Sequence, residues 1–265
     1  MSAASAALPI EVPAAATMSR SRLAGAYLAE ARYETVRMLR TPGFAIPFLG
    51  LPVGLYLLLG VVIFGAAIAK DAQAGVFVFA AFSVFGVAGP GMFGFGMVVA
   101  LEREQGLVRL KRALPMPPAA YLTAKLLMAV LFAALVMATM IAATPLAHLA
   151  LGARQAIGVA FVGLLGSLPF CAIGLFLGTR TSGRSAAAIV NVVYQLMLHL
   201  SGIFYALPKA LRVVAPVWPT YHLQQLVFWT VGAHSEGSPF IHAAFLAGLT
   251  VVLTATSVRR LELRG

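Results

Sequence analysis

The stretch LEREQGLVRLKRALPMPP, residues 101–118, lies between two long apolar runs and carries six charged residues. The chain around it is very different, because 61% of all residues are hydrophobic, only 10% are charged, and the mean hydropathy is +0.93. Soluble domains typically carry about 25% charged residues. The composition therefore predicts a membrane protein in which residues 101–118 form a loop that meets water.

Six apolar stretches are long enough to cross a bilayer as helices. A spanning helix needs about 20 mostly apolar residues, and in lipid every backbone N–H and C=O must be paired within its own segment. The stretches are residues 44–69, 75–100, 121–146, 157–177, 185–204 and 240–258. Little chain remains for a soluble catalytic domain. We therefore predict an all-α integral membrane protein, with one six-span domain over residues 20–265.

Lysine and arginine in the short loops predict the orientation, because they are enriched on the cytoplasmic side. Fourteen lie before the first span, between spans two and three, between spans four and five, and in the tail. Only four, Lys70, Arg154, Lys209 and Arg212, lie on the opposite side. Both termini are therefore expected in the cytoplasm. The net charge of +11 reflects this bias and attraction to the lipid bilayer rather than nucleic-acid binding, since no basic face is interleaved with stacking aromatics.

The chain before the first span has two parts. Residues 1–19 are rich in Ala, Ser and Pro and are predicted to be disordered. Residues 20–41 place apolar side chains such as Ala24 and Leu28 on one side of a helix and arginines on the other. This pattern predicts an amphipathic helix at the membrane interface. It is either a passive anchor or a contact for a partner, and the pattern favours neither.

The loop at 101–118 has the charge order of a short helix. Glu102 and Glu104 come near its start and Arg109 near its end, as the helix dipole favours, and Pro115 and its neighbours stop it. A rigid helix between two spans could transmit motion from a cytosolic partner into the bilayer. Composition alone favours the simpler alternative, a solvated loop that only adds to the positive charge inside.

Several motifs resemble those of ABC type-2 (ABC-2) transporter permeases. The resemblance is carried by Glu102-Arg103-Glu104, Gly106, Leu110, Arg112-Ala113 and Pro115. The Ala- and Arg-rich helix that ends at residues 40–43 resembles the family's connecting helix, and residues 201–204, 207–208, 216 and 219–221 resemble its outer segment. The resemblance covers nearly everything from residue 20 onward.

This family implies a six-span half-transporter of the bacterial inner membrane, which dimerises and works with two copies of a separate ATP-binding subunit. It also implies that the loop is the coupling helix that docks on the ATPase. The residues assigned to that role are Glu102, Arg103, Glu104, Gly106, Leu110, Arg112 and Pro115. Residues 101–118 are the coupling loop, 20–41 the connecting helix, and 205–239 an outer re-entrant or interfacial segment.

The sequence itself offers no catalytic site, cofactor site or metal site. It has no Gly-x-x-x-x-Gly-Lys-Ser/Thr phosphate loop, no His-Glu-x-x-His and no Gly-x-Ser-x-Gly motif. Its five histidines lack metal-ligand spacing on a shared helix face. The chain is therefore not expected to be an enzyme, and energy must arrive through a partner.

Two spans carry unusual residues. In the fifth, Asn191, Gln195 and His199 recur every four residues and form a polar stripe, which either lines a substrate path or forms hydrogen bonds between helices. In the second, glycines surround Pro90. The segment Gly89-Pro90-Gly91 is either a hinge or a site of close helix packing.

These observations predict the membrane subunit of an ATP-driven exporter of a small amphipathic molecule, either homodimeric or paired with a similar permease. The sequence does not identify the cargo. A secondary transporter is an alternative, but it would usually need intramembrane carboxylates or broken helices. A non-transporting membrane scaffold is another, and it would tolerate loss of the polar stripe.

Overall fold

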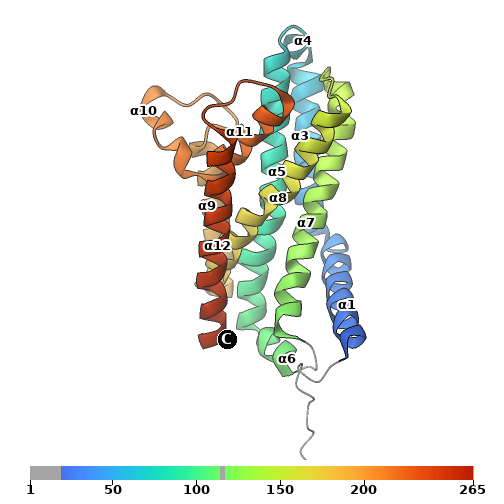
Figure 1. Cartoon of the computed structure of the whole chain (residues 1–265), viewed down its shortest axis with the longest axis vertical. Helices are drawn as coiled ribbons and strands as arrows, with labels where there is room; N and C mark the ends of the chain where they lie inside the picture. The colour runs from blue at the N-terminus through green and yellow to red at the C-terminus, as the bar shows by residue number, and fades with distance from the viewer. Residues whose placement is uncertain (1–18, 114–116, 265) are drawn as a thin grey trace, which may run out of the picture.

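The computed structural model describes residues 19–113 and 117–264, and every regular element within these ranges is helical. Except for Ser19, the predicted disordered segment 1–19 lies outside them. The long helices form an elongated bundle (Figure 1). They are α1 (Arg20–Leu39), α5 (Ala72–Glu104), α7 (Pro118–Ala143), α8 (Ala153–Gly178), α9 (Gly183–Leu200) and α12 (Pro239–Arg264).

Both ends of the described chain lie at the same end of the bundle. The start of α1, the short helix α6 (Leu107–Ala113) and the end of α12 are all found there, whereas α4 (Gly65–Ile68) and α10 (Lys209–Arg212) lie at the other end (Figure 1). We call these the α6 end and the α10 end. That the α6 end faces the cytoplasm stays a prediction from the charge count.

Five of the described helical stretches are long and apolar enough to cross a membrane. They are Pro42–Ile63, Ala72–Glu104, Ala119–Ala147, Ala153–Gly178 and Pro239–Leu261. The fifth predicted span forms α9, which is not among them because Arg184 and the three residues of its polar stripe reduce its hydropathy. At 1.5 Å per residue its 18 residues are about 27 Å long, close to the hydrocarbon thickness. A sixth crossing by α9 therefore stays a prediction.

The first span is less regular than the single helix expected for residues 44–69. It consists of α2 (Pro42–Ala45), a wide π-helical turn (Ile46–Gly50), α3 (Leu51–Leu57) and a second π-helical turn (Leu58–Ile63). Pro47 and Pro52 have no N–H to donate, so the α-helical hydrogen-bond pattern cannot continue unchanged through them. Local π-helical turns keep the remaining groups paired in such cases.

Helix α1 is confirmed as a helix over residues 20–39, and it packs along α7 at the α6 end of the bundle (Figure 1). Its buried residues are Ala31, Glu34 and Met38, which lie on one face. The predicted position in the membrane interface is a separate matter and stays a prediction.

Helices α5 and α8 pack with their backbones almost in contact. A methyl group on Gly174 would lie 2.7 Å from the carbonyl oxygens of both Gly91 and Met92, and one on Gly91 would lie 2.8 Å from the Cys171 nitrogen. Glycine is what permits this approach. The segment Gly89-Pro90-Gly91 thus lies within a continuous helix and a close packing contact. A hinge there stays a prediction.

Adding one methyl group at this contact should destabilise the fold. We expect Gly174→Ala to cost about 1–3 kcal/mol, because the new methyl group would overlap backbone atoms that cannot rotate away. The measurement is the apparent melting temperature of the purified protein in detergent. Gly248→Ala is the control, since nothing lies within 4 Å of a methyl group there. Equal melting temperatures for the two variants would contradict the close contact.

The segment after α9 forms short helices at the α10 end. These are α10, a 3₁₀ turn (Ala215–Val217) and α11 (Pro219–Val231), which packs against α5, α8 and α12. Pro216 and Pro219 lie at the starts of two of these helices, where a missing N–H costs nothing. Before α12 begins, residues 205–239 thus contain only short helices and turns, and their assignment to an outer re-entrant or interfacial segment stays a prediction.

Candidate functional site

The predicted coupling loop contains a helix that is separated from α5 by a tight turn. Helix α5 ends at Glu104, Gly106 has φ of 75°, and α6 follows from Leu107. A positive φ of this size is comfortable for glycine but strained for most other residues. Pro115 and the side chain of Arg112 lie outside the described part of the chain.

Glu102 belongs to a buried ion cluster that joins three helices. The cluster consists of Glu34 and Arg37 of α1, Glu102 of α5 and Lys125 of α7. The Lys125 ammonium lies 2.6 Å from a Glu34 oxygen and 3.1 Å from a Glu102 oxygen. Arg37 lies 2.7 Å from Glu102 and 2.8 Å from Glu34. Two carboxylates and two cations balance each other.

The cluster is buried to an unusual degree. Lys125 is 0% exposed, Glu34 1% and Glu102 3%. The Tyr121 hydroxyl donates a 2.6 Å hydrogen bond to Glu102. Burial lowers the pKa of Arg37, but the carboxylates of Glu34 and Glu102 outweigh it and raise that pKa overall. A buried charge without a partner is strongly destabilising, so all four residues must stay together. They therefore hold α1, α5 and α7 in one arrangement.

A second ion pair ties α6 to α1. Lys111 of α6 is paired with Glu30 of α1, and its ammonium lies 5.0 Å from the centre of the Tyr121 ring and 5.8 Å from that of Tyr33. Cations are attracted to aromatic faces at such distances. Helix α6 is therefore attached to the connecting helix by side-chain contacts as well as to α5 by the chain.

Arg103 and Glu104 hold the connection between α8 and α9. Arg103 donates hydrogen bonds to the carbonyl oxygens of Thr179 and, at 2.5 Å, Thr181. The Glu104 carboxylate accepts from the N–H of Gly183, the first residue of α9, where negative charge is favourable. From α12, Arg260 donates to the Thr179 oxygen at 3.1 Å. Four helix ends thus meet at residues 179–183.

The predicted coupling residues therefore divide into two groups. Glu102, Arg103 and Glu104 make contacts within the chain, whereas Leu110 is 60% exposed and its neighbour Arg109 is also exposed. Leu110 is a large apolar side chain at a helix that carries charges. It is the side chain of this group that is best placed to contact another protein.

Sequence reasoning missed half of the ion cluster. The loop count assigned 18 of the 19 lysines and arginines to one side of the membrane or the other. The remaining one is Lys125, which lies inside the third predicted span and was therefore left out. Glu34 falls between Ala31 and Met38 on the buried face of α1. Charges on apolar faces are rare and usually paired. Matching the two would have predicted that α1 packs on α7.

The polar stripe of α9 faces outward in the single chain. Asn191, Gln195 and His199 are all exposed, and Nδ1 of His199 donates to the Gln195 carbonyl at 2.8 Å. The opposite face of α9 is buried, and there the Tyr194 hydroxyl donates to the Phe85 carbonyl of α5 at 2.7 Å. The structure thus brings the three predicted residues together on one exposed face, separate from the coupling residues.

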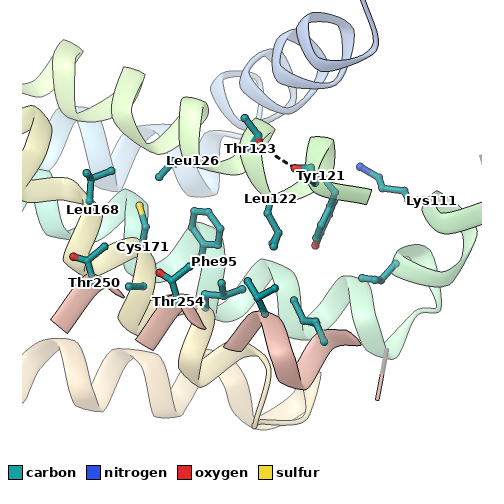
Figure 2. Close-up of a pocket in the computed structure, with 16 residues that line it drawn as sticks. Phe95, Lys111, Tyr121, Leu122, Thr123, Leu126, Leu168, Cys171, Thr250 and Thr254 are labelled. Carbon is teal, nitrogen blue, oxygen red and sulfur yellow. Dashed lines mark hydrogen bonds between the residues drawn. The ribbon is translucent and has the colours of Figure 1, made fainter. Parts of the chain in front are cut away.

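A mostly apolar cavity of about 690 Å³ lies between α7 and α12, with α5 and α8 as its floor (Figure 2). The hydroxyls of Thr123 and Thr250 donate to carbonyl oxygens of their own helices, at 2.9 and 2.7 Å, so toward a ligand they can only accept. Lys111 lies at one end of the cavity and Leu168 at the other. Of the predicted site residues that the structure describes, none lines it.

Comparison with known proteins defines the class. The family model for the ABC-2 type transporter matches residues 26–231. The chain therefore belongs to the ABC-2 type transporter family, a family of membrane-spanning transporter subunits. It is a multi-pass membrane protein, and its family implies an ATP-binding partner.

One relative adds detail. The chain is 27% identical over 144 residues to YvfS of Bacillus subtilis (strain 168), a protein named as a transport permease. The match covers 53% of this chain and 59% of that relative's length.

Proposed function

We propose that the chain is the membrane subunit of an ATP-driven exporter in a bacterial inner membrane, with both termini in the cytoplasm. The observation that carries the proposal is the construction of the α6 end. Helix α6 exposes Leu110 for a partner, while Lys111 and the preceding turn attach it to α1 and α5. A displacement of α6 would therefore reach α1 and also α5, which is long and apolar enough to run through the bilayer. Two copies of an ATP-binding subunit cause this displacement of α6.

The exposed face of α9 supports a paired assembly. Polar groups at bilayer depth are costly unless they face protein or water, and in the single chain this stripe is exposed rather than packed against other helices. A second copy of the chain placed against α9 would remove the stripe from lipid. The resulting seam is the proposed route for cargo.

The cargo class is a small amphipathic molecule. The cavity between α7 and α12 is mostly apolar, and the Lys111 ammonium near one end is already paired with Glu30, so the lining suits a molecule with a large apolar body and a small polar head. Burial of apolar surface would supply most of the binding free energy.

Changing the α9 stripe should alter substrate choice. Gln195→Leu and His199→Leu remove polar groups without changing helix length, so we expect a different rank order of compounds that stimulate the partnered ATPase, with basal hydrolysis retained. The measurement is ATP hydrolysis and efflux in proteoliposomes containing both subunits. Ile189→Leu, also on an exposed part of α9, is the control.

Three outcomes would contradict this proposal. Lost dimerisation with an unchanged rank order would make the stripe a packing contact. Efflux by the permease without ATP or its partner would favour a secondary transporter. An unchanged substrate profile without the stripe would place the cargo route elsewhere, and the absence of any efflux with either form of the protein would favour a scaffold.

A further inference from the structure

Two buried histidines meet at the α10 end, where α11 packs on α12. Nδ1 of His222 lies 2.8 Å from Nδ1 of His242, and each residue is 5% exposed. The His222 ring also stacks on Phe245 with the ring centres 3.9 Å apart. The two rings are thus held in place, with their Nδ1 atoms at hydrogen-bond distance.

The other nitrogen of each ring faces a backbone carbonyl. Nε2 of His222 lies 2.8 Å from the Pro216 oxygen, and Nε2 of His242 lies 2.6 Å from the Glu236 oxygen. A carbonyl oxygen can only accept, so each Nε2 must carry a hydrogen. If both imidazoles are neutral, their hydrogens are then used, and two Nδ1 lone pairs face each other.

Counting hydrogens leaves one arrangement that satisfies all three contacts. One extra proton placed between the Nδ1 atoms makes one ring an imidazolium donor and the other an imidazole acceptor. A neutral pair with a hydrogen on one Nδ1 leaves a lone pair facing a carbonyl oxygen, and a doubly charged pair brings two N–H groups together. We infer that His222 and His242 form a buried binding site for a single proton.

The surroundings suit one positive charge. Tyr221 lies beside both rings, and its hydroxyl donates to the Glu236 carboxylate at 2.9 Å. Burial, reinforced by Glu236, raises the pKa of Tyr221 to about 12, so this phenol stays neutral. The Glu236 carboxylate is the nearby negative charge. It offsets the proton without contacting either imidazole directly.

Other titratable residues lie on the elements that pack around α11, and no described contact joins them to the pair. Toward the α10 end they are Asp71 before α5, Arg154 of α8, His199 of α9 and His234 before α12, and the nearby α10 adds Lys209 and Arg212. Burial lowers the pKa of His222, against the Pro216 carbonyl and together with charge on His242. This direction disfavours a charge on His222, so the case for one shared proton rests on the geometry of the three hydrogen-bond contacts.

The proton joins four parts of the α10 end through hydrogen bonds: the 3₁₀ turn, α11, the loop before α12, and α12 itself. Its loss would leave two lone pairs opposed and weaken the α11–α12 contact. In the proposed orientation this end faces outward, so the pH outside the cell would set the occupancy of the site.

The test is solid-state ¹⁵N NMR of the full chain, labelled at histidine and reconstituted in lipid vesicles. An ordinary histidine has a pKa near 6.5 and is almost entirely neutral at about pH 8. We expect one of the five histidines to remain an imidazolium at that pH. Five neutral histidines in the wild-type protein would overturn the inference, whatever the behaviour of any variant.

Substitutions assign the signal. His222→Gln and His242→Gln should each abolish the imidazolium signal, while His234→Gln, at an exposed histidine in the same outer segment, should keep it. Survival of the signal in both of the first two variants would place the charge elsewhere and exclude the pair as its source. Size-exclusion chromatography identifies variants that remain folded.

Discussion

Lys125→Met should be among the most destabilising single substitutions in the chain. It removes one of two cations from the buried ion cluster and leaves Glu34 and Glu102 sharing Arg37 alone. Breaking a buried pair by removing one partner costs about 3–5 kcal/mol, because the remaining charge has no water to solvate it. The measurement is the apparent melting temperature and folded yield in detergent.

A double variant separates lost pairing from lost packing. Glu34→Met together with Lys125→Met leaves the Arg37–Glu102 pair, 2.7 Å apart, with no net charge. It should recover much of the stability lost in Lys125→Met, giving a positive coupling energy in the mutant cycle. Arg109→Met, which removes an exposed cation, should leave the melting temperature near wild type. A fully stable Lys125→Met protein would show that the cluster is not what holds α1.

Gly106→Val should abolish coupled transport while the protein still folds. The residue has φ of 75°, and a β-branched side chain is a strong outlier there, so the turn would adopt another conformation and carry α6 away from its position. The turn follows the end of α5 and lies outside the candidate membrane spans, so the helical bundle should still form. We expect ATP-driven efflux to fall more than about tenfold, equivalent to about 1.4 kcal/mol of coupling.

Gly106→Asn is the matched control for this turn. Asparagine tolerates positive φ better than other residues with a side chain, so this variant should retain most of the efflux. Nothing lies within 4 Å of a methyl group at Gly106, and the difference between the two variants therefore reports backbone conformation rather than steric overlap. Normal efflux in Gly106→Val would make the loop a topology signal only.

Apolar length predicted most of the fold, since five of the six expected spans coincide, within six residues at either end, with helical stretches long and apolar enough to cross a membrane. Particular residues show what apolar length alone does not predict. Pro47 and Pro52 lie in a stretch that is apolar enough to span, and hydropathy does not report that a missing N–H changes the helical turn. In α9, the polar side chains of the stripe made it a candidate cargo path, and the same side chains lower the hydropathy of the helix below that of the other spans.

The candidate site was harder to predict because contacts between distant residues decide it. Glu102 and Glu104 look alike in the loop, yet one lies in the ion cluster and the other accepts from the start of α9. Their difference depends on where α1, α7 and α9 pack. The histidine pair likewise brings together residues 20 positions apart that share no helix.

The contact between Glu104 and the first amide of α9 has a mechanical consequence. Arg103 and Glu104 are consecutive residues at the end of α5. Both form hydrogen bonds to the short link between α8 and α9, at Thr181 and at Gly183, where α9 begins. A rotation of the end of α5 would therefore be transmitted directly to the start of α9 through these two contacts, without involving the part of either helix that lies in lipid. We expect the helix that bears the polar stripe to be the first to respond when α6 is displaced.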